Sequence, residues 1–320
     1  MPVGCGAWSP YLLMWRFLST RLAMGILTIW ITTVLVTLLI HAVPGDPVQI
    51  MYAQSQGTTP EQIEEVRRSL GLDRPIPVQY VMYLERLIEG DLGKTIRGGQ
   101  PVLEVIAQRL PNTLALATAA MFIAVSIGLP IGFLAAYRDG TWLDTGLMVL
   151  AIAGISMPHF WLGLVLLFFF ALELGWLPVS GNDPMNLILP ALTLGLSNAA
   201  IFARLTRASM IDILNQDFVQ TAFAKGLPRN LVLRRHVLRA GLLPVVTMMG
   251  LQFAFMMGGA IVVENIFSWN GLGRMAVEAI FQRDYPIIQG FILTFSVVVV
   301  VVSISIDALY SLLDPRIRRG

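Results

Sequence analysis

Few residues in this chain have the types and spacing that covalent or metal chemistry requires. His41, His159 and His236 lie in different segments, with no carboxylate or cysteine at metal-ligand spacing. The single cysteine, Cys5, cannot form an internal disulfide. His159 follows Pro158 inside an apolar stretch, so we interpret it as a packed or pore-facing polar residue, with a metal or proton-relay role as the alternative.

Two further patterns resemble chemical motifs but lack a required part. The residues Gly93-Lys94-Thr95 look like the end of a phosphate-binding loop, yet Ile88 occupies the position of the glycine needed five residues before Gly93. Ser156, in the run Gly154–Pro158, has none of the surroundings of a nucleophile elbow and is interpreted as a hydroxyl that lines a helix kink. These patterns therefore predict neither nucleotide binding nor hydrolysis by this chain.

The composition indicates a protein that spans a membrane several times. Of 320 residues, 56% are apolar and only 13% are charged, against about 25% charged in an average soluble domain. Several apolar stretches exceed the roughly 18 residues that a membrane-spanning helix needs. We predict an all-α, polytopic membrane protein with six spans, and these are residues 22–43, 113–137, 145–172, 187–207, 241–263 and 287–313.

The distribution of lysine and arginine predicts the orientation of these spans. Thirteen such residues, from Arg16 to Arg319, flank one side, whereas the short loops of the other side hold only Arg274 and Arg283. Both termini should therefore be cytoplasmic, as segments 1–21 and 314–320. Residues 113–313 should form a five-helix transmembrane core that contains a cytoplasmic loop, 208–240.

The segment 44–112 should be an extracytoplasmic helical insertion after the first span. Amphipathic patterns predict helices from Thr59 to about Leu70, from Val78 to Ile88 and from Val102 to Leu110. Such an insertion could receive a delivered solute or only cover the mouth of a pore.

Two smaller features concern how the spans pack. Gly128 and Gly132 form a small-xxx-small pair suited to close helix contact, although glycine is also common in membrane spans generally. Asp307 is the one carboxylate well within a predicted span, and it could pair with Arg204 or Arg207 or act directly in transport.

The loop from Asp217 to Pro244 has the features of a docking element. Asp217 can act as an N-cap with Gln220 in a capping-box position, and Gly226 followed by Pro228 is a helix stop. These signals bracket a helix of about eight residues, which is too short to be stable alone in water. Its apolar residues fall on one face at helical spacing, and these are Phe218, Val219, Ala222 and Phe223. Because basic residues flank this helix, we predict that it docks on another protein on the same side of the membrane.

The same loop resembles the EAA motif of permease subunits of ATP-binding-cassette importers. The matching residues are Gln220-Thr221-Ala222, Gly226 and Leu243-Pro244, with Gln220 where the family usually has glutamate. Further motifs resemble the first permease of dipeptide, oligopeptide and nickel importers, with glutathione permeases also similar. They are Val43–Pro47, Leu70–Pro75, Gly90–Gly93, Leu174–Pro178, Arg204–Met210, Phe267–Arg274, Arg283–Pro286 and Asp314–Arg316. Asn270 stands where the family commonly has proline.

The resemblance implies a non-catalytic, pore-forming subunit in a bacterial inner membrane. Its implied partners are a second homologous permease, two cytoplasmic ATPase subunits that bind ATP and magnesium, and an extracytoplasmic solute-binding protein. The residues expected to couple it to the ATPases are Asp217, Phe218, Gln220, Thr221, Ala222, Phe223, Lys225 and Gly226. Dipeptides or oligopeptides are the expected cargo, with glutathione or a nickel chelate as alternatives.

Polar residues in the spans predict a weakly binding solute path. The candidates are Ser156, Ser197, Asn198, Thr247, Gln252 and Thr294. Such groups offer replaceable hydrogen bonds, so we expect specificity to reside in the separate binding protein. A secondary transporter or channel is the rival, but it would need paired intramembrane charges or an inverted repeat, and the sequence has neither. An intramembrane hydrolase would need a nucleophile beside a base, which the sequence also lacks.

Overall fold

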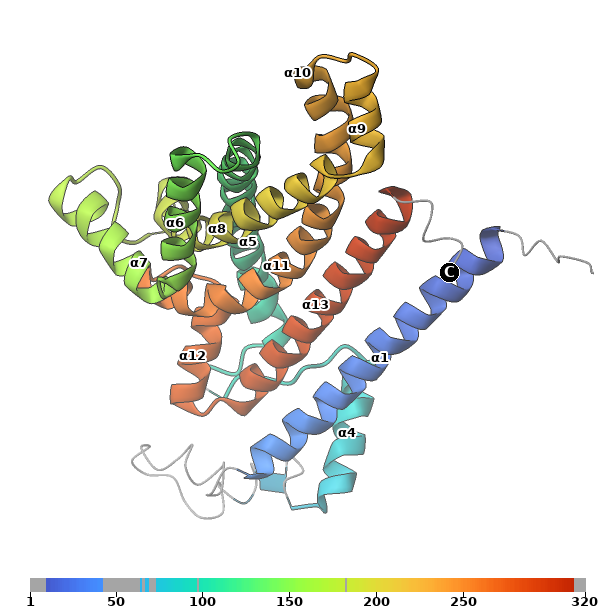
Figure 1. The fold of residues 1–320 in the computed structure, drawn as a ribbon. Helices are drawn as coiled ribbons and strands as arrows, with labels where there is room; N and C mark the ends of the chain where they lie inside the picture. The colour runs from blue at the N-terminus through green and yellow to red at the C-terminus, as the bar shows by residue number, and fades with distance from the viewer. Residues whose placement is uncertain are drawn as a thin grey trace, which may run out of the picture. The chain divides into compact units, whose positions relative to one another are not determined.

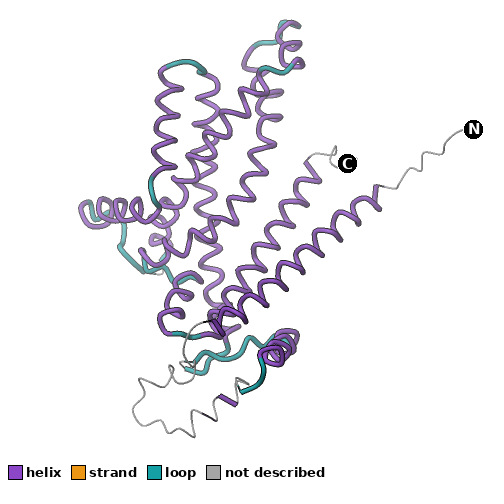
Figure 2. Tube along the Cα trace, turned by 60° about the horizontal axis from the view of Figure 1, so that its bottom comes forward, coloured by secondary structure: helices purple, strands orange, loops and turns teal. Residues whose placement is uncertain are grey.

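The computed structural model describes residues 10–42, 64, 67–68, 73–96, 98–181 and 183–313. These residues are helical with connecting loops, and the one β-bridge among them joins Lys94 and Pro101. Figure 2 shows helices and loops only in this part of the chain. The all-α prediction is therefore confirmed. Most of the helix expected from Thr59 to Leu70, and the motifs Val43–Pro47 and Asp314–Arg316, lie outside the described residues.

Among the described residues, five helices are long and apolar enough to cross a membrane. They are α1 (Pro10–Ala42), α5 (Val102–Tyr137), α8 (Ile188–Leu214), α11 (Leu238–Ile266) and α13 (Tyr285–Leu313). Each overlaps one of the predicted spans, and at least one end of each helix lies within a few residues of the predicted end. The helix predicted from Val102 to Leu110 is not separate, because α5 continues through Pro111 without a break.

The span predicted at 145–172 is not one helix. It consists of α6 (Trp142–Ser156), then α7 (His159–Leu166) and the π-helix η1 (Leu167–Glu173), and the two parts are bent by 102°. Figure 1 shows α7 leaving the end of α6 at a steep angle. The break follows from Pro158, because a residue before proline avoids the helical conformation, and Met157 has extended backbone (φ −80°, ψ 124°).

The chain divides into two compact units, of which the first comprises Met1–Leu110 and Met275–Ile304. In this unit α1 lies beside α13 (Figures 1 and 2), and a Cβ on Gly25 would come within 2.7 Å of Val300. The predicted helix at Val78–Ile88 is present as α4 (Ile76–Ile88). Between the fifth and sixth spans, a short helix that was not predicted, α12 (Leu272–Gln282), precedes α13.

A loop of the first unit is tied to the start of α13 by a buried carboxylate. Asp284 is 2% exposed and accepts hydrogen bonds from the backbone N–H of Ile96 (2.9 Å) and of Ile287 (3.3 Å). Within the same unit, Gly290 of α13 packs against Val102 and Ile106.

The second unit comprises Pro111–Arg274 and Ser305–Gly320, and α8 lies at its centre. Buried residues of α8 pack against α6, α7 and α11, with Leu194 and Phe202 fully buried in the main core. A Cβ on Gly128 would lie 2.5 Å from the Ala199 carbonyl, and one on Gly132 would overlap the Ala203 carbonyl. Of the two interpretations of these glycines, close packing is the one that the structure supports, because they let α5 lie directly against the backbone of α8.

Candidate functional site

The short helix predicted in the basic loop is present as α9 (Asp217–Ala224), and its length of eight residues agrees with the prediction. The predicted cap is wrong, however. Gln216 holds the N-cap position with extended backbone (φ −78°, ψ 146°), Asp217 is the first helical residue, and no side chain caps the helix. Gln220 does not close a capping box, because its amide donates to the Leu214 carbonyl at 3.2 Å.

The other end of α9 closes as the sequence predicts. Gly226 has a φ of +78°, a left-handed conformation that favours glycine. Its N–H donates to the Phe223 carbonyl (2.9 Å), and the N–H of Leu227 donates to the Ala222 carbonyl (3.3 Å). This pair of bonds is a Schellman motif, which satisfies two carbonyls at the helix end and fixes the direction of the chain that follows.

The apolar residues of α9 divide between two surroundings. Val219 (0% exposed) and Ala222 (7%) belong to a cluster of this chain's own residues that includes Met210 and Val237, and Phe223 packs partly against it. Phe218 is 48% exposed. The apolar face predicted to dock is therefore partly buried within the protein itself, and Phe218 is its most exposed residue.

Other residues of α9 and of the turn after it are exposed, as Phe218 is. Asp217, Gln220, Thr221, Lys225 and Gly226 are exposed on the outer side of α9. After α10 (Arg229–Val232), the π-helix η3 (Leu233–Val237) carries the exposed Arg235 and leads directly into α11. Figure 1 shows α9 and α10 together at one end of α8 and α11.

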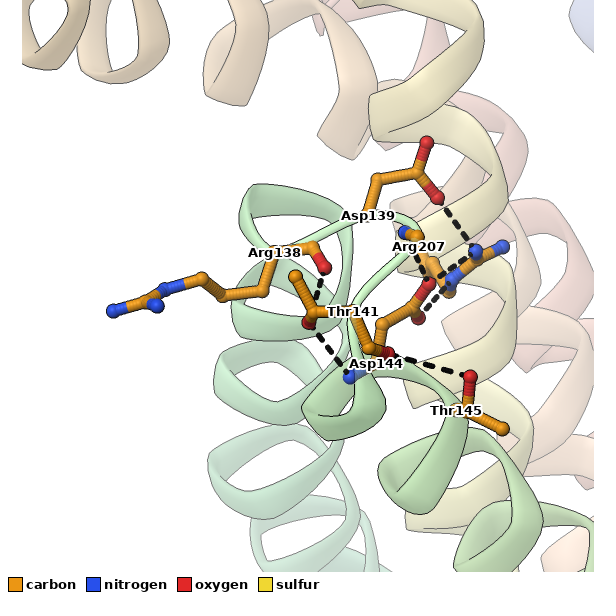
Figure 3. Close-up of polar contacts among 7 residues, drawn as sticks. Arg138, Asp139, Thr141, Asp144, Thr145 and Arg207 are labelled. Carbon is orange, nitrogen blue, oxygen red and sulfur yellow. Dashed lines mark hydrogen bonds and ion pairs between the residues drawn. The ribbon is translucent and has the colours of Figure 1, made fainter.

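An ion-pair cluster joins the turn between α5 and α6 to α8 (Figure 3). Arg207 donates from Nε and a terminal nitrogen to the two carboxylate oxygens of Asp144, at 2.5 and 2.7 Å, and also to Asp139 at 2.8 Å. The Asp144 side chain is 5% exposed and also accepts from the backbone N–H of Gly140. Arg207 therefore pairs with Asp144 and Asp139. The pairing suggested for Asp307 stays a prediction, because its side chain lies outside the described residues.

A fully buried glutamate near the end of α11 was missed by the sequence reasoning. Glu264 is 0% exposed and accepts hydrogen bonds from the Thr113 hydroxyl (2.6 Å) and from the backbone N–H groups of Gly273 (2.7 Å) and Arg274 (3.1 Å). A Cβ on Gly271 would overlap its carboxylate. A signal was available, because Glu264 lies three residues before the motif Phe267–Arg274.

Nearby bonds complete this cluster. The indole N–H of Trp269 donates to the Asn112 carbonyl (3.0 Å), and the Asn112 amide donates to the Asn270 carbonyl (2.7 Å). Residue 270 takes part in this contact through its backbone carbonyl, which proline also has. Asparagine at this position therefore keeps the contact, although the family that the sequence resembles commonly has proline there.

A partly open cavity of about 380 Å³ lies at the break between α6 and α7. Four of the six predicted path residues line it: Ser156 at the break, Ser197 and Asn198 from α8, and Gln252 from α11. His159 lines it too, and its Nδ1 atom is buried with no hydrogen-bond partner among the described residues.

The other two predicted path residues lie elsewhere. Thr247 is not among the residues that line the cavity, and its hydroxyl donates to the Leu243 carbonyl of its own helix at 3.1 Å. Thr294 belongs to α13 in the first unit.

Comparison with known proteins decides the family. The model of the binding-protein-dependent transport system inner membrane component matches residues 128–319, and the N-terminal model of such membrane components matches residues 14–117. The chain belongs to this family. It is a permease subunit of an ATP-binding-cassette importer, of the dipeptide and oligopeptide group.

Relatives of the permease are similar over nearly their whole length. It is 44% identical over 306 residues to the glutathione transport system permease protein GsiC of Pectobacterium atrosepticum, covering 95% of this chain and 99% of that protein. The GsiC protein of Escherichia coli strain K12 is 43% identical over the same coverage.

Solved structures share the fold of the permease at low sequence identity. A chain of the inward-facing MetNI methionine ABC transporter superposes with a TM-score of 0.57 at 17% identity, covering 66% of the permease and 97% of that chain. A chain of an amino acid ABC transporter crystallised with histidines gives a TM-score of 0.51 at 19% identity, over 67% and 94% of the two chains.

Proposed function

We propose that this permease forms half of the pore of an importer for short peptides. The other half is a second homologous permease, and an extracytoplasmic binding protein delivers the cargo. Two cytoplasmic ATPase subunits, which carry ATP and magnesium, supply the energy. The complex lies in a bacterial inner membrane with both termini of the permease in the cytoplasm. The family and the names of its relatives support this assembly.

Glutathione is the first cargo to test, because the relatives at 43% and 44% identity are glutathione permeases. Glutathione is itself a short peptide, so this candidate refines the peptide proposal and does not replace it. Uptake of labelled glutathione, a dipeptide and a nickel chelate by the reconstituted importer separates the three possible cargoes. Uptake of the chelate alone would refute the peptide proposal.

The geometry of α9 carries the proposal that this helix couples the permease to the ATPases. Val219 and Ala222 attach α9 to the body of the permease, while Phe218 of the same helix is exposed. A force on Phe218 is therefore passed to the cluster that contains Met210 of α8 and Val237 of η3. Gly226 keeps the end of the helix closed by the Schellman motif.

Two substitutions of similar chemistry test this coupling. Phe218→Asp places a charge on the exposed side and should leave the permease folded, while abolishing ATP hydrolysis stimulated by the loaded binding protein. Val219→Asp places the charge in the buried cluster and should lower the yield of folded permease. Ile88→Asp, at an exposed apolar residue in α4 (87% exposed), serves as the control and should retain coupling. Normal stimulated hydrolysis in Phe218→Asp would refute the docking role.

The cavity at the α6–α7 break supports a path for the cargo through the second unit. We propose that Ser156, Ser197, Asn198 and Gln252 contact the solute there, since these are the predicted path residues that line the cavity. Selection among cargo side chains lies in the binding protein. A hybrid importer with the binding protein of a related system should acquire the cargo of that system, and retention of the original cargo would contradict this division.

A further inference from the structure

We infer that the cavity at the α6–α7 break is a binding subsite for an uncharged peptide group, the –CO–NH– unit that all short peptides share. This inference rests on the proposed peptide cargo and adds the part of the cargo that the permease itself recognises. The volume of about 380 Å³ lies within the range of small-molecule pockets, roughly 300–1,000 Å³.

Buried amide side chains line two sides of this cavity. Gln252 of α11 and Asn198 of α8 are each 7% exposed. The Asn198 amide donates to the Leu194 carbonyl of its own helix (2.9 Å), which leaves its side-chain oxygen available. No hydrogen bond is found for the side-chain amide of Gln252 among the described residues, and this amide is not one of the fully buried unpaired groups, so it is open to the cavity that it lines. A bound solute with both a donor and an acceptor would satisfy it.

The remaining polar atoms offer further single hydrogen bonds. The hydroxyls of Ser156 and Ser197 donate to carbonyls of their own helices, at 2.9 and 3.4 Å, so their oxygens can still accept. The Nδ1 atom of His159 is buried at the helix break without a partner among the described residues. Together these groups present donors and acceptors in one cavity, as an amide ligand requires.

The lack of charged groups in the cavity lining favours an uncharged ligand. None of the residues that line the cavity carries a carboxylate, an ammonium or a guanidinium group. A peptide terminus placed there would lose its hydration without gaining a counter-ion, which is costly. The apolar parts of the wall include Leu194, Ile201, Phe255 and Met256. The cavity therefore suits the neutral backbone of a peptide with its side chains against apolar walls, while both charged ends lie outside.

The first experiment measures binding to the purified importer without its binding protein. In a Cys5→Ser background, Ser156→Cys places a thiol at an exposed position on the cavity wall. The rate of alkylation by a small thiol reagent is then measured with three probes. They are N-acetylalanine methylamide, its methyl ester analogue, which lacks one N–H, and the N-acetylalanine anion.

The methylamide should protect the thiol at a concentration about three- to tenfold lower than the ester, the effect of one hydrogen bond, and the anion should protect least. Gln252→Met, an apolar replacement of similar size, should remove the difference between amide and ester. Thr247→Val, in the same helix but outside the cavity lining, should preserve that difference. Equal protection by all three probes, no protection, or an unchanged difference in Gln252→Met would overturn the subsite.

A second measurement separates this inference from the peptide-importer proposal. ATP-driven uptake of a dipeptide and of labelled glutathione is measured with the complete importer and its binding protein. If uptake occurs but the thiol is never protected, the subsite is refuted and the importer proposal stands. If the thiol is protected as described but no peptide is taken up, the cargo proposal is refuted and the amide subsite remains. Should Gln252→Met fail to assemble, Asn198→Leu removes the other amide of the lining, from α8, and should give the same loss of discrimination.

Discussion

Removing the buried carboxylate of Glu264 should destabilise the permease more than the same Glu→Ala change at an exposed glutamate. The carboxylate accepts from the Thr113 hydroxyl and from the backbone N–H groups of Gly273 and Arg274. Glu264→Ala leaves these donors without an acceptor in a region closed to water. Each of the three unsatisfied buried donors costs about 1–3 kcal/mol, so we expect a loss of roughly 3–9 kcal/mol.

The conservative variant Glu264→Gln should cost less, roughly 1–2 kcal/mol. Its remaining oxygen can still accept from Gly273 and Arg274, but its NH₂ group faces the Thr113 hydroxyl, which also accepts a hydrogen bond from Leu272 N–H at 2.8 Å. That hydroxyl then loses its acceptor. The three proteins should therefore rank wild type, Gln and Ala in decreasing stability.

Thermal unfolding of the purified importer, followed by tryptophan fluorescence, measures this order. Trp269 is a local reporter, because its indole N–H donates to the Asn112 carbonyl within the same cluster. Glu173→Ala, at an exposed glutamate at the end of η1, is the control and should leave the midpoint unchanged. Equal midpoints for wild type and Glu264→Ala would show that the carboxylate does not hold this turn in place.

Three further predictions concern packing and topology. Asp144→Ala should lower the stability of the permease by about 2–3 kcal/mol, because the Asp144 side chain is only 5% exposed. Asp139→Ala should lower it by under about 1 kcal/mol, because the Asp139 side chain is 54% exposed. Urea unfolding midpoints that fall equally in the two variants would contradict this. Gly132→Leu should greatly reduce the recovery of intact importer on size-exclusion chromatography, since any Cβ there overlaps a carbonyl of α8; normal recovery would show that the helices can separate at no cost. A cysteine at Gln100 should react with an impermeant thiol reagent added to intact spheroplasts, and one at Asn230 only after permeabilisation, while the reverse pattern would invert the proposed orientation.

Features that depend on local sequence were predictable. Runs of apolar residues located the five long helices, and Gly226 with Pro228 located the end of α9. The spacing of Gly128 and Gly132 indicated a close helix contact as one of two interpretations, and the structure shows that contact. Each of these signals lies within a few residues of the feature that it predicts.

Features that depend on distant residues were not predictable in the same way. The apolar residues of α9 cover an arc of about 140° at 100° per residue. This pattern alone does not predict that Val219 is buried in a cluster with Met210 of the same chain. The Glu264 cluster joins residues about 150 positions apart, such as Thr113. The break at Pro158 was expected only as a kink, because the angle depends on what packs around the two halves.

The 102° break also changes what the second unit requires of the lipid around it. At about 1.5 Å per residue, α6, with its 15 residues, is about 22 Å long, and α7 with η1 is of similar length. Neither half alone matches a hydrocarbon layer of about 30 Å. Either the bilayer becomes thinner beside α6 and α7, or the break at Pro158 lies at mid-depth. In the second case, other parts of the protein must shelter the backbone of the break from the acyl chains. In both cases the length of the surrounding acyl chains should influence the conformation of this break, and through it the shape of the cavity that Ser156 and His159 line.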